Sequence, residues 1–255
     1  MDKPRYSRWQ QTTAIHRPNN NLLNALREED YELLGANLVA MEAAADTLLY
    51  HPGDDVEVVY FPCAASLAAF LVTSDDGNDV EVTLVGREGA VGGIVSCGNL
   101  PAYCRIVAKG KGPFVRLSIR HLEAAKLKSS SLRALFARYA DCLLAQVFQS
   151  TACNAIHSIE QRTAKWIISA LDRTGDDVVP ITQEQLATLL GVGRSYASRI
   201  IQTFKAGGIL ETRRGALVVR KPDMLKARAC RCNASVADHF EKVLHGVYPI
   251  AEAAE

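Results

Sequence analysis

The stretch TQEQLATLLGVGRSYASRIIQTFK, residues 182–205, predicts two helices joined by a glycine turn. Thr182 stands three residues before Gln185, which is the spacing of a capping box at the start of a helix. Gly191 ends the first helix, because glycine adopts the left-handed conformation at little cost. Apolar residues recur at helical spacing on both sides of this turn. The stretch is therefore predicted to be a helix-turn-helix motif.

The second predicted helix keeps polar and basic side chains on the face that its apolar residues leave exposed. Such a helix lies in the major groove of DNA, where these side chains reach base edges and phosphates. The alternative is an ordinary helical hairpin whose polar face is simply solvated. The candidate DNA-binding residues of the motif are Thr182, Gly193, Arg194, Ser195, Ser198, Arg199 and Gln202.

Two short apolar-rich runs follow the motif, at residues 209–212 and 216–219, on either side of Arg213-Arg214-Gly215. This pattern predicts a tight β-hairpin with a basic tip. A hairpin directly after a recognition helix is a wing, so Arg213 and Arg214 are predicted to contact phosphates.

The positive charge of the chain is concentrated in this region. The formal net charge of the whole chain is only +1. Between Arg194 and Arg231, however, ten Lys or Arg residues stand against Glu211 and Asp223. Counterion release from DNA requires a local basic surface rather than a basic average. The charge distribution therefore favours DNA as the partner.

Length and composition indicate a soluble protein of two domains and a connector. The chain has 255 residues, of which 48% are hydrophobic and 22% charged. No apolar run approaches the roughly 20 residues of a membrane helix. The first 20 residues lack the hydrophobic core of a signal peptide and are expected to form a flexible arm. We therefore expect a cytoplasmic protein whose seven cysteines are reduced.

The first half of the chain changes from helical to strand periodicity. Residues 21–42 carry apolar side chains at helical spacing. Short alternating runs separated by Gly and Asp turns then predict a small antiparallel barrel or jelly roll. The strand candidates are residues 56–61, 66–73, 80–85, 103–108 and 114–119.

Helical periodicity returns at residues 131–154, in a stripe too long and too apolar for a surface helix. A long apolar helix between two domains favours a dimer helix. The alternative is a core helix packed on its own β-domain. Another helix is predicted at residues 158–171, and a polar helix at residues 234–244 is expected to cover the wing domain. The stripe consists of Leu132, Leu135, Phe136, Tyr139, Leu143, Leu144 and Val147.

The order of these elements resembles the Crp/Fnr family of bacterial transcription regulators, over residues 21–231. It implies an α+β fold with a jelly-roll-like antiparallel β-roll, a long dimerisation helix and a C-terminal winged helix-turn-helix. The implied domains are an arm (1–20), a cyclic-nucleotide-binding-like roll (21–125), a dimerisation helix (126–157), a winged helix-turn-helix (158–230) and a helical extension (231–255). The most specific matches are Tyr60-Phe61-Pro62, Val85-Gly86-Arg87-Glu88-Gly89, Ser158-Ile159-Glu160-Gln161-Arg162 and the helix-turn-helix itself.

The resemblance also implies function. The resemblance implies that the protein is a homodimeric regulator and not an enzyme. Its implied partners are RNA polymerase and a palindromic site in double-stranded DNA. In this family the first arginine of the recognition helix and the one five residues later contact DNA, and they match Arg194 and Arg199. The family often has glutamate after the first arginine, where this chain has Ser195. The preferred half-site is therefore expected to differ.

The residues with which the family's cyclic-AMP-binding members hold their ligand are not matched. The aligned stretches are Val91-Gly92-Gly93 and Tyr103-Cys104-Arg105, where the carboxylate is missing and the phosphate arginine is missing or displaced to Arg105. The candidate effector-binding residues are thus Gly92, Gly93 and Arg105, and the effector is not expected to be cyclic AMP. The alternatives are a cyclic-nucleotide or thiol-based redox sensor, and a sensor whose helix-turn-helix contacts proteins.

No cofactor or metal site is expected from the cysteine and histidine spacing. The cysteine cluster of the family's iron–sulfur branch is absent, because the first cysteine is Cys63. Cys230 and Cys232 stand among arginines, which lower thiol pKa, but with His239 and His245 they fit no standard zinc spacing. His157 is interpreted as a hydrogen-bonding residue rather than a haem ligand. Inert buried thiols are predicted at Cys63, Cys97, Cys104, Cys142 and Cys153.

Overall fold

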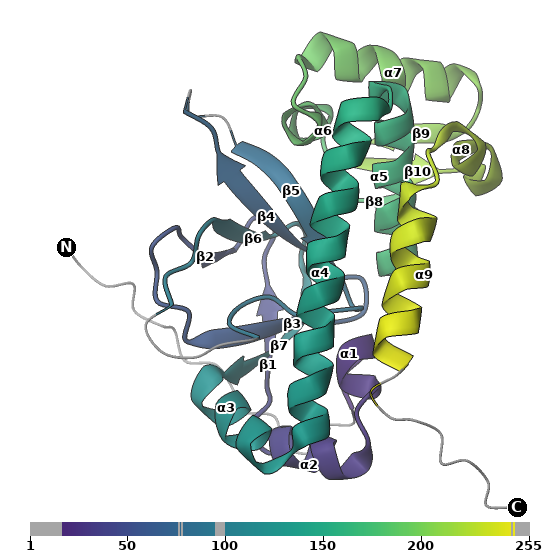
Figure 1. Cartoon of the computed structure of the whole chain (residues 1–255). Helices are drawn as coiled ribbons and strands as arrows, with labels where there is room; N and C mark the ends of the chain where they lie inside the picture. The colour runs from purple at the N-terminus through teal and green to yellow at the C-terminus, as the bar shows by residue number, and fades with distance from the viewer. Residues whose placement is uncertain (1–16, 76, 78, 95–99, 246, 248–255) are drawn as a thin grey trace, which may run out of the picture.

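Two antiparallel sheets form the N-terminal β-roll, as the strand patterns predict (Figure 1). The computed structural model describes residues 17–75, 77, 79–94, 100–245 and 247. One sheet has the order β1-β7-β3 and the other the order β2-β6-β4-β5. Their strands are β1 (Val39–Ala43), β2 (Leu48–Tyr50), β3 (Val58–Pro62), β4 (Ala68–Thr73), β5 (Asp79–Val85), β6 (Arg105–Ala108) and β7 (Gly112–Ser118).

The helical pattern at residues 21–42 corresponds to two short helices and a strand. α1 (Asn21–Asn24) and α2 (Glu28–Gly35) are followed by β1, so the prediction of one helix is wrong after residue 35. β1 pairs with the distant strand β7 over its whole length, from Val39 opposite Arg116 to Ala43 opposite Gly112. This cross-strand pairing outweighs the local helical period.

The last residues of the predicted N-terminal arm are fixed against the roll. The Asn20 side chain is fully buried and donates to the carbonyls of Pro62 and Gly89, both at 2.8 Å. Its oxygen accepts from the backbone N–H of Leu23 at 3.0 Å and so caps α1. Asn20 is therefore part of the folded roll, and residues 1–16 of the predicted arm lie outside the described part of the chain.

The long helix α4 (Ser130–Ile156) follows α3 (Ile119–Lys128) and runs the length of the molecule (Figure 1). The first half of its apolar stripe packs on the roll, as the core-helix alternative predicts. Leu132, Leu135, Phe136 and Tyr139 are buried in the core of the roll. The Tyr139 hydroxyl pins α4 to the roll, because it donates to the carbonyl of Ala90 at 3.0 Å and accepts from its N–H at 2.9 Å.

The second half of the stripe faces solvent. Leu144 is 50% exposed, Val147 36% and the neighbouring Phe148 64%. Neither α4 nor any other helix among the described residues is both long and apolar enough to cross a membrane.

The C-terminal domain joins a helix-turn-helix to a small sheet of order β8-β10-β9. Its core is continuous with the outer side of the four-stranded sheet of the roll, where Leu71 and Leu84 contribute to one cluster with Ile167 and Phe204. Its elements are α5 (Ile159–Thr174), β8 (Val178–Val179), α6 (Gln183–Leu190), α7 (Arg194–Ala206), β9 (Leu210–Arg213), β10 (Ala216–Val219) and α8 (Pro222–Arg228).

Polar contacts fasten α5 to the roll as well. Trp166 Nε1 donates to Glu81 at 2.8 Å, and Arg173 Nε donates to Glu88 at 2.6 Å. Lys109 lies 3.3 Å from the second carboxylate oxygen of Glu81. Burial raises the pKa of Glu81, and the nearby cations oppose that rise. The two domains are thus held together by a hydrophobic interface with buried polar contacts.

The last helix, α9 (Cys232–His245), runs antiparallel along α4 (Figure 1, yellow). The prediction that it covers the wing domain is wrong. The Phe240 and Tyr139 rings meet edge to face at 6.3 Å, and Arg138 donates to the carbonyl of Val243 at 2.8 Å. Apolar side chains of α9, Phe240 and Leu244 among them, are half-buried against the core that α4 shares with the roll. Residues 246 and 248–255 of the predicted extension lie outside the described residues.

Candidate nucleic-acid interface

The predicted capping box begins α6. Thr182 Oγ1 accepts from the N–H of Gln185 at 3.1 Å, and Gln185 Oε1 accepts from the N–H of Thr182 at 2.9 Å. These reciprocal bonds satisfy two amides that a helix start otherwise leaves without partners. The same arrangement, between Ser158 and Gln161, begins α5. Local chemistry therefore fixes where both helices begin.

The turn between α6 and α7 is also the predicted one. Gly191 has φ +65° and ψ 39° and is followed by Val192, whose N–H donates to the carbonyl of Ala187 at 3.0 Å. Gly193 is extended, with φ −65° and ψ 145°, and precedes the first residue of α7. An added Cβ would find nothing within 4 Å at either glycine. Space for a side chain is therefore available at both positions, and the two glycines differ only in backbone conformation.

Gly191→Ser is expected to destabilise the protein by about 1–2 kcal/mol, because serine pays the left-handed penalty there. Gly193→Ser is expected to be neutral or to stabilise by a few tenths of a kcal/mol, since serine caps a helix slightly better than glycine. Urea unfolding of both variants measures the difference. Equal stabilities would show that the turn does not depend on the conformation of Gly191.

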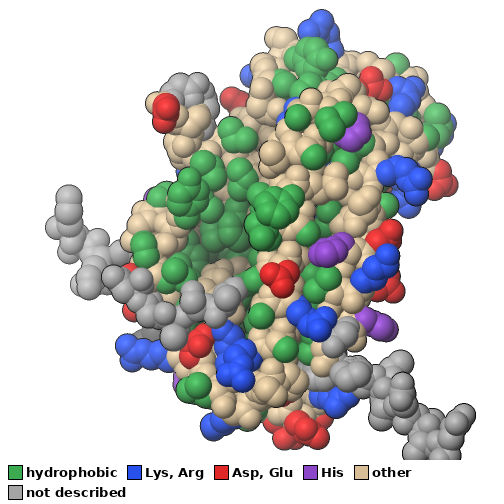
Figure 2. Space-filling model, viewed as in Figure 1, with side chains coloured by type: hydrophobic (Ala, Val, Ile, Leu, Met, Phe, Trp, Pro, Cys, Tyr) green, Lys and Arg blue, Asp and Glu red, His purple; other side chains and the backbone are tan. Residues whose placement is uncertain are grey.

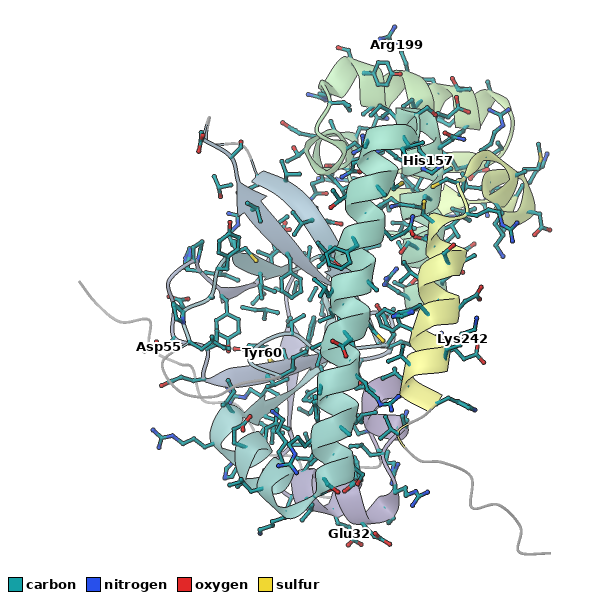
Figure 3. The ribbon with its side chains drawn as sticks, viewed as in Figure 1. Glu32, Asp55, Tyr60, His157, Arg199 and Lys242 are labelled. Atoms are coloured by element: carbon teal, nitrogen blue, oxygen red, sulfur yellow. The ribbon has the colours of Figure 1, made fainter. Side chains whose placement is uncertain are left out.

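α7 buries one face and presents the other to solvent. Ala197, Ile201 and Phe204 are buried in the domain core, with Ile200 almost as deep. Arg199 points away from the molecule at the top of Figure 3. Of the predicted contact residues on this helix, Ser198 is half-buried and the exposed ones are Arg194, Ser195, Arg199 and Gln202.

Tyr196 is a further exposed residue of this face that the sequence analysis missed. Its side chain is 44% exposed, although large apolar side chains of this domain otherwise lie mostly inside. The Arg199 guanidinium lies 5.1 Å from the centroid of its ring. This cation–π contact orients Arg199 before any ligand is bound. The signal was an aromatic residue three positions before an arginine on the polar face of the helix.

β9 and β10 form the predicted wing. Arg213 pairs with Ala216, so the turn contains Arg214 and Gly215, and Gly215 has φ +72°. Arg213 and Arg214 are both exposed. The basic surface is weaker than the count of cations suggests, because Glu211 pairs with Arg220 and Glu160 with Arg228, each at 2.7 Å.

The residues predicted to bind an effector have structural partners. Gly92 has φ +108°, and an added Cβ would lie 2.4 Å from the carbonyl oxygen of Val58, so the close approach of two backbones requires glycine. Gly93 is buried beside it. Arg105 forms an ion pair with Asp79.

A cavity of about 330 Å³ lies elsewhere, between β5, α4, α5 and α9. It is separate from Gly92, Gly93 and Arg105, which do not line it. Its polar lining includes Glu81, Gln146, Arg162, Trp166 and Arg173.

The cysteines fall into two groups. Burial raises the pKa of Cys63 and of Cys142 to about 11 each, as expected for inert thiols. Cys104 is half-buried, and Cys97 lies outside the described residues.

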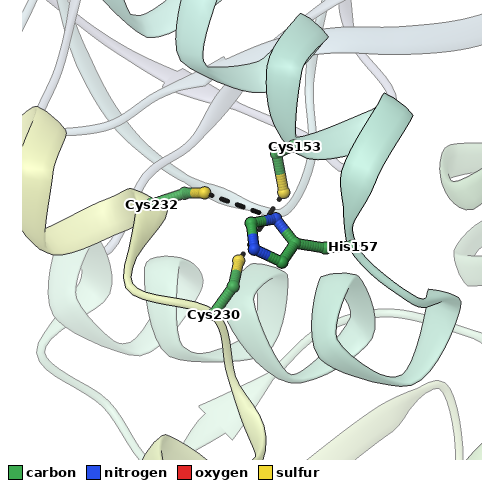
Figure 4. Close-up of side chains that lie close together, drawn as sticks. All are labelled: Cys153, His157, Cys230 and Cys232. Atoms are coloured by element: carbon green, nitrogen blue, oxygen red, sulfur yellow. Dashed lines mark hydrogen bonds between the residues drawn. The ribbon is translucent and has the colours of Figure 1, made fainter.

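The second group was not predicted as a group. Cys153, His157, Cys230 and Cys232 come together where α4 meets the start of α9 (Figure 4). The two histidines that the sequence analysis paired with Cys230 and Cys232 do not take part, because His239 and His245 are exposed further along α9.

Comparison with known proteins identifies the C-terminal domain. Residues 161–228 match the model of the Crp-like helix-turn-helix domain. No curated protein matches the sequence significantly.

Solved structures share the architecture of the chain. FixK2 from Bradyrhizobium japonicum is 16% identical, with a TM-score of 0.63 over 76% of this chain and 98% of its own. CLP, a c-di-GMP-responsive global regulator from Xanthomonas campestris, is 15% identical, with a TM-score of 0.60 over 76% and 99%. A CooA mutant from Carboxydothermus hydrogenoformans is also 15% identical, with a TM-score of 0.57 over 86% and 97%.

The chain thus has the architecture of a helix-turn-helix transcription regulator. More particularly, the chain has the architecture of a Crp/Fnr-type regulator, and residues 161–228 belong to the Crp-like helix-turn-helix domain family.

Proposed function

We propose that the protein binds palindromic DNA sites as a homodimer and regulates transcription there, in the cytoplasm and through RNA polymerase. The observation that carries the proposal is the exposed face of α7, with Arg194 and Arg199, together with the exposed arginines of the wing tip in the same domain. A helix with this face fits the major groove, and a basic hairpin beside it fits the adjacent phosphates. Regulators of this type are generally not enzymes.

Each predicted contact residue has a proposed role. Arg194 and Arg199 contact bases and phosphates, and Ser195, Ser198 and Gln202 complete the readout of base edges. Thr182 and Gly193 stand at the starts of α6 and α7, where unsatisfied backbone amides attract phosphates.

The exposed half of the α4 stripe supports the dimer. Leu144, Val147 and Phe148 follow one another at the spacing of one helix face. Figure 2 shows hydrophobic side chains gathered in a hollow where the roll meets α4. Two α4 helices that pack through this face would present two α7 helices to half-sites about 34 Å apart.

The effector is proposed to be a molecule other than cyclic AMP. A ligand phosphate would have to compete with Asp79 for the Arg105 guanidinium. The pocket between β5, α4, α5 and α9 is the better candidate for an effector site, because both domains line it.

Substitution of two arginines separates base readout from phosphate binding. Arg199→Ala is expected to cost about 1–3 kcal/mol on a selected site and much less on random DNA, because a base contact is lost. Arg213→Ala is expected to weaken both kinds of DNA equally and to reduce the salt slope by about 1. Sites are first selected from random DNA, and gel shifts over a range of salt then give the affinities. Equal losses on both DNAs for both variants would contradict the assigned roles, and wild-type protein without salt-dependent binding would contradict the function.

A further inference from the structure

Three buried cysteines and one half-buried histidine from separate parts of the chain form a single cluster. Cys153 and His157 lie one turn apart at the end of α4, and Cys230 and Cys232 stand on either side of Arg231, where α9 begins. Cys153 is fully buried, and Cys230 and Cys232 are 9% and 7% exposed. The potential ligand atoms of the four residues all lie within 4.8 Å of one another.

The distances in the cluster match the edges of a tetrahedral metal site. Zinc bonds of about 2.3 Å to sulfur and 2.0–2.1 Å to nitrogen place two sulfurs about 3.8 Å apart, and a sulfur and a nitrogen about 3.6 Å apart. In the structure the Cys153 and Cys230 sulfurs are 3.6 Å apart. Cys232 Sγ lies 3.7 Å from Nδ1 of His157 (Figure 4). Two edges of the tetrahedron are thus already formed.

We propose that Cys153, His157, Cys230 and Cys232 bind one Zn²⁺ ion. Three thiolates and one imidazole are a ligand set that tetrahedral zinc sites use, and soft sulfur ligands disfavour magnesium and calcium. Four protein ligands leave no open position, so the site is structural rather than catalytic.

The surroundings of the cluster fit the needs of a zinc–thiolate site. Gln149, one turn before Cys153 on α4, donates from Nε2 to Cys232 Sγ at 3.2 Å, which is an outer-shell hydrogen bond of the kind that stabilises bound thiolates. Next to Cys232, Asn233 donates from Nδ2 to the carbonyl of Lys165 at 2.9 Å and holds the start of α9 against α5.

The position of the site gives the metal a mechanical role. His157 is the C-cap residue of α4, and the next residue, Ser158, is the N-cap of α5. Cys230 comes just after α8, the last helix of the DNA-binding domain. One ion would therefore tie the long helix, the DNA-binding domain and α9 together at the junction between the two domains.

Metal analysis of the full-length protein tests the site. Protein purified with reductant and without chelator is expected to hold one zinc per chain. Replacement of zinc by Co²⁺ is expected to give the strong thiolate-to-cobalt charge-transfer absorption and the visible bands of tetrahedral coordination. This spectrum is measured on the wild-type chain, so it remains informative if a variant fails to fold.

Matched variants assign the ligands. Cys153→Ser, Cys230→Ser and His157→Asn are expected to lose the zinc, whereas Cys104→Ser and His239→Asn are expected to keep it. Gln149→Ala is expected to weaken zinc affinity by about 10–100-fold. The inference is overturned if reduced wild-type protein supplied with zinc binds none and shows no cobalt–thiolate absorption. Loss of zinc from His239→Asn but not from His157→Asn would also overturn it. Metal content is independent of DNA binding, so either proposal can fail while the other stands.

Discussion

Phe148→Glu is expected to convert the proposed dimer into a monomer. The side chain is 64% exposed on α4 and is the most exposed of Leu144, Val147 and Phe148, which form the face that a second copy would cover. In a two-fold dimer the substitution acts twice, and each central aromatic contact is worth about 2 kcal/mol or more. The sum of about 4 kcal/mol raises the dimer Kd by roughly three orders of magnitude. Light scattering during gel filtration measures the change, from twice the chain mass of 27.8 kDa to that mass alone.

Leu127→Glu is the matched control for this experiment. Leu127 is 83% exposed near the end of α3, away from the proposed dimer face. This variant is expected to remain a dimer and to bind selected DNA as the wild type does. A wild-type protein that is monomeric at micromolar concentration, or a Phe148→Glu variant that stays dimeric, would show that α4 is not the interface.

Gly92→Ala is expected to have the largest effect on stability. The residue combines φ +108° with a carbonyl oxygen of β3 that an added Cβ would approach to 2.4 Å. Backbone strain alone costs about 1–3 kcal/mol. The clash with a backbone atom cannot be relieved by a side-chain rotation. The free energy of unfolding is therefore expected to fall by about 3–5 kcal/mol in all. For a chain of this size, that lowers Tm by about 6–20 °C in a thermal unfolding measurement.

Gly53→Ala separates the cost of backbone strain from the cost of the steric clash. Gly53 has φ +86° in a turn before β3, and an added Cβ would find nothing within 4 Å. The substitution therefore introduces the strain without the clash, and it is expected to lower the free energy of unfolding by only about 1–3 kcal/mol. If the two variants unfold at the same temperature, the close approach of β3 to Gly92 does not limit the residue to glycine.

The features that depend on neighbouring residues could be predicted from the sequence. The helix-turn-helix was predicted closely, because a capping box and a left-handed glycine are properties of a few consecutive residues. The wing followed from its Arg-Arg-Gly turn in the same way. The strands β3 to β7 of the roll were located to within two residues for the same reason.

The features that depend on residues far apart in the sequence could not be predicted from it. β1 is a strand because β7 lies beside it, and no local pattern around Val39 contains that information. The apolar side of α9 indicates burial but does not specify a partner, so its packing on α4 was missed. The cysteine–histidine cluster was hidden for a similar reason. A whole domain separates His157 from Cys230 in the sequence, and only its folding brings their side chains together.

The course of α9 has a consequence for the order of events during synthesis. Phe240 and Val247 pack into the same core as Leu22 and Leu23, so residues from both ends of the described chain complete one cluster. The ribosome must therefore synthesise the chain as far as Val247 before the roll can reach its final packing. N-terminal domains generally fold first as they emerge. Here α1 and the roll would wait in a partly packed state for α9.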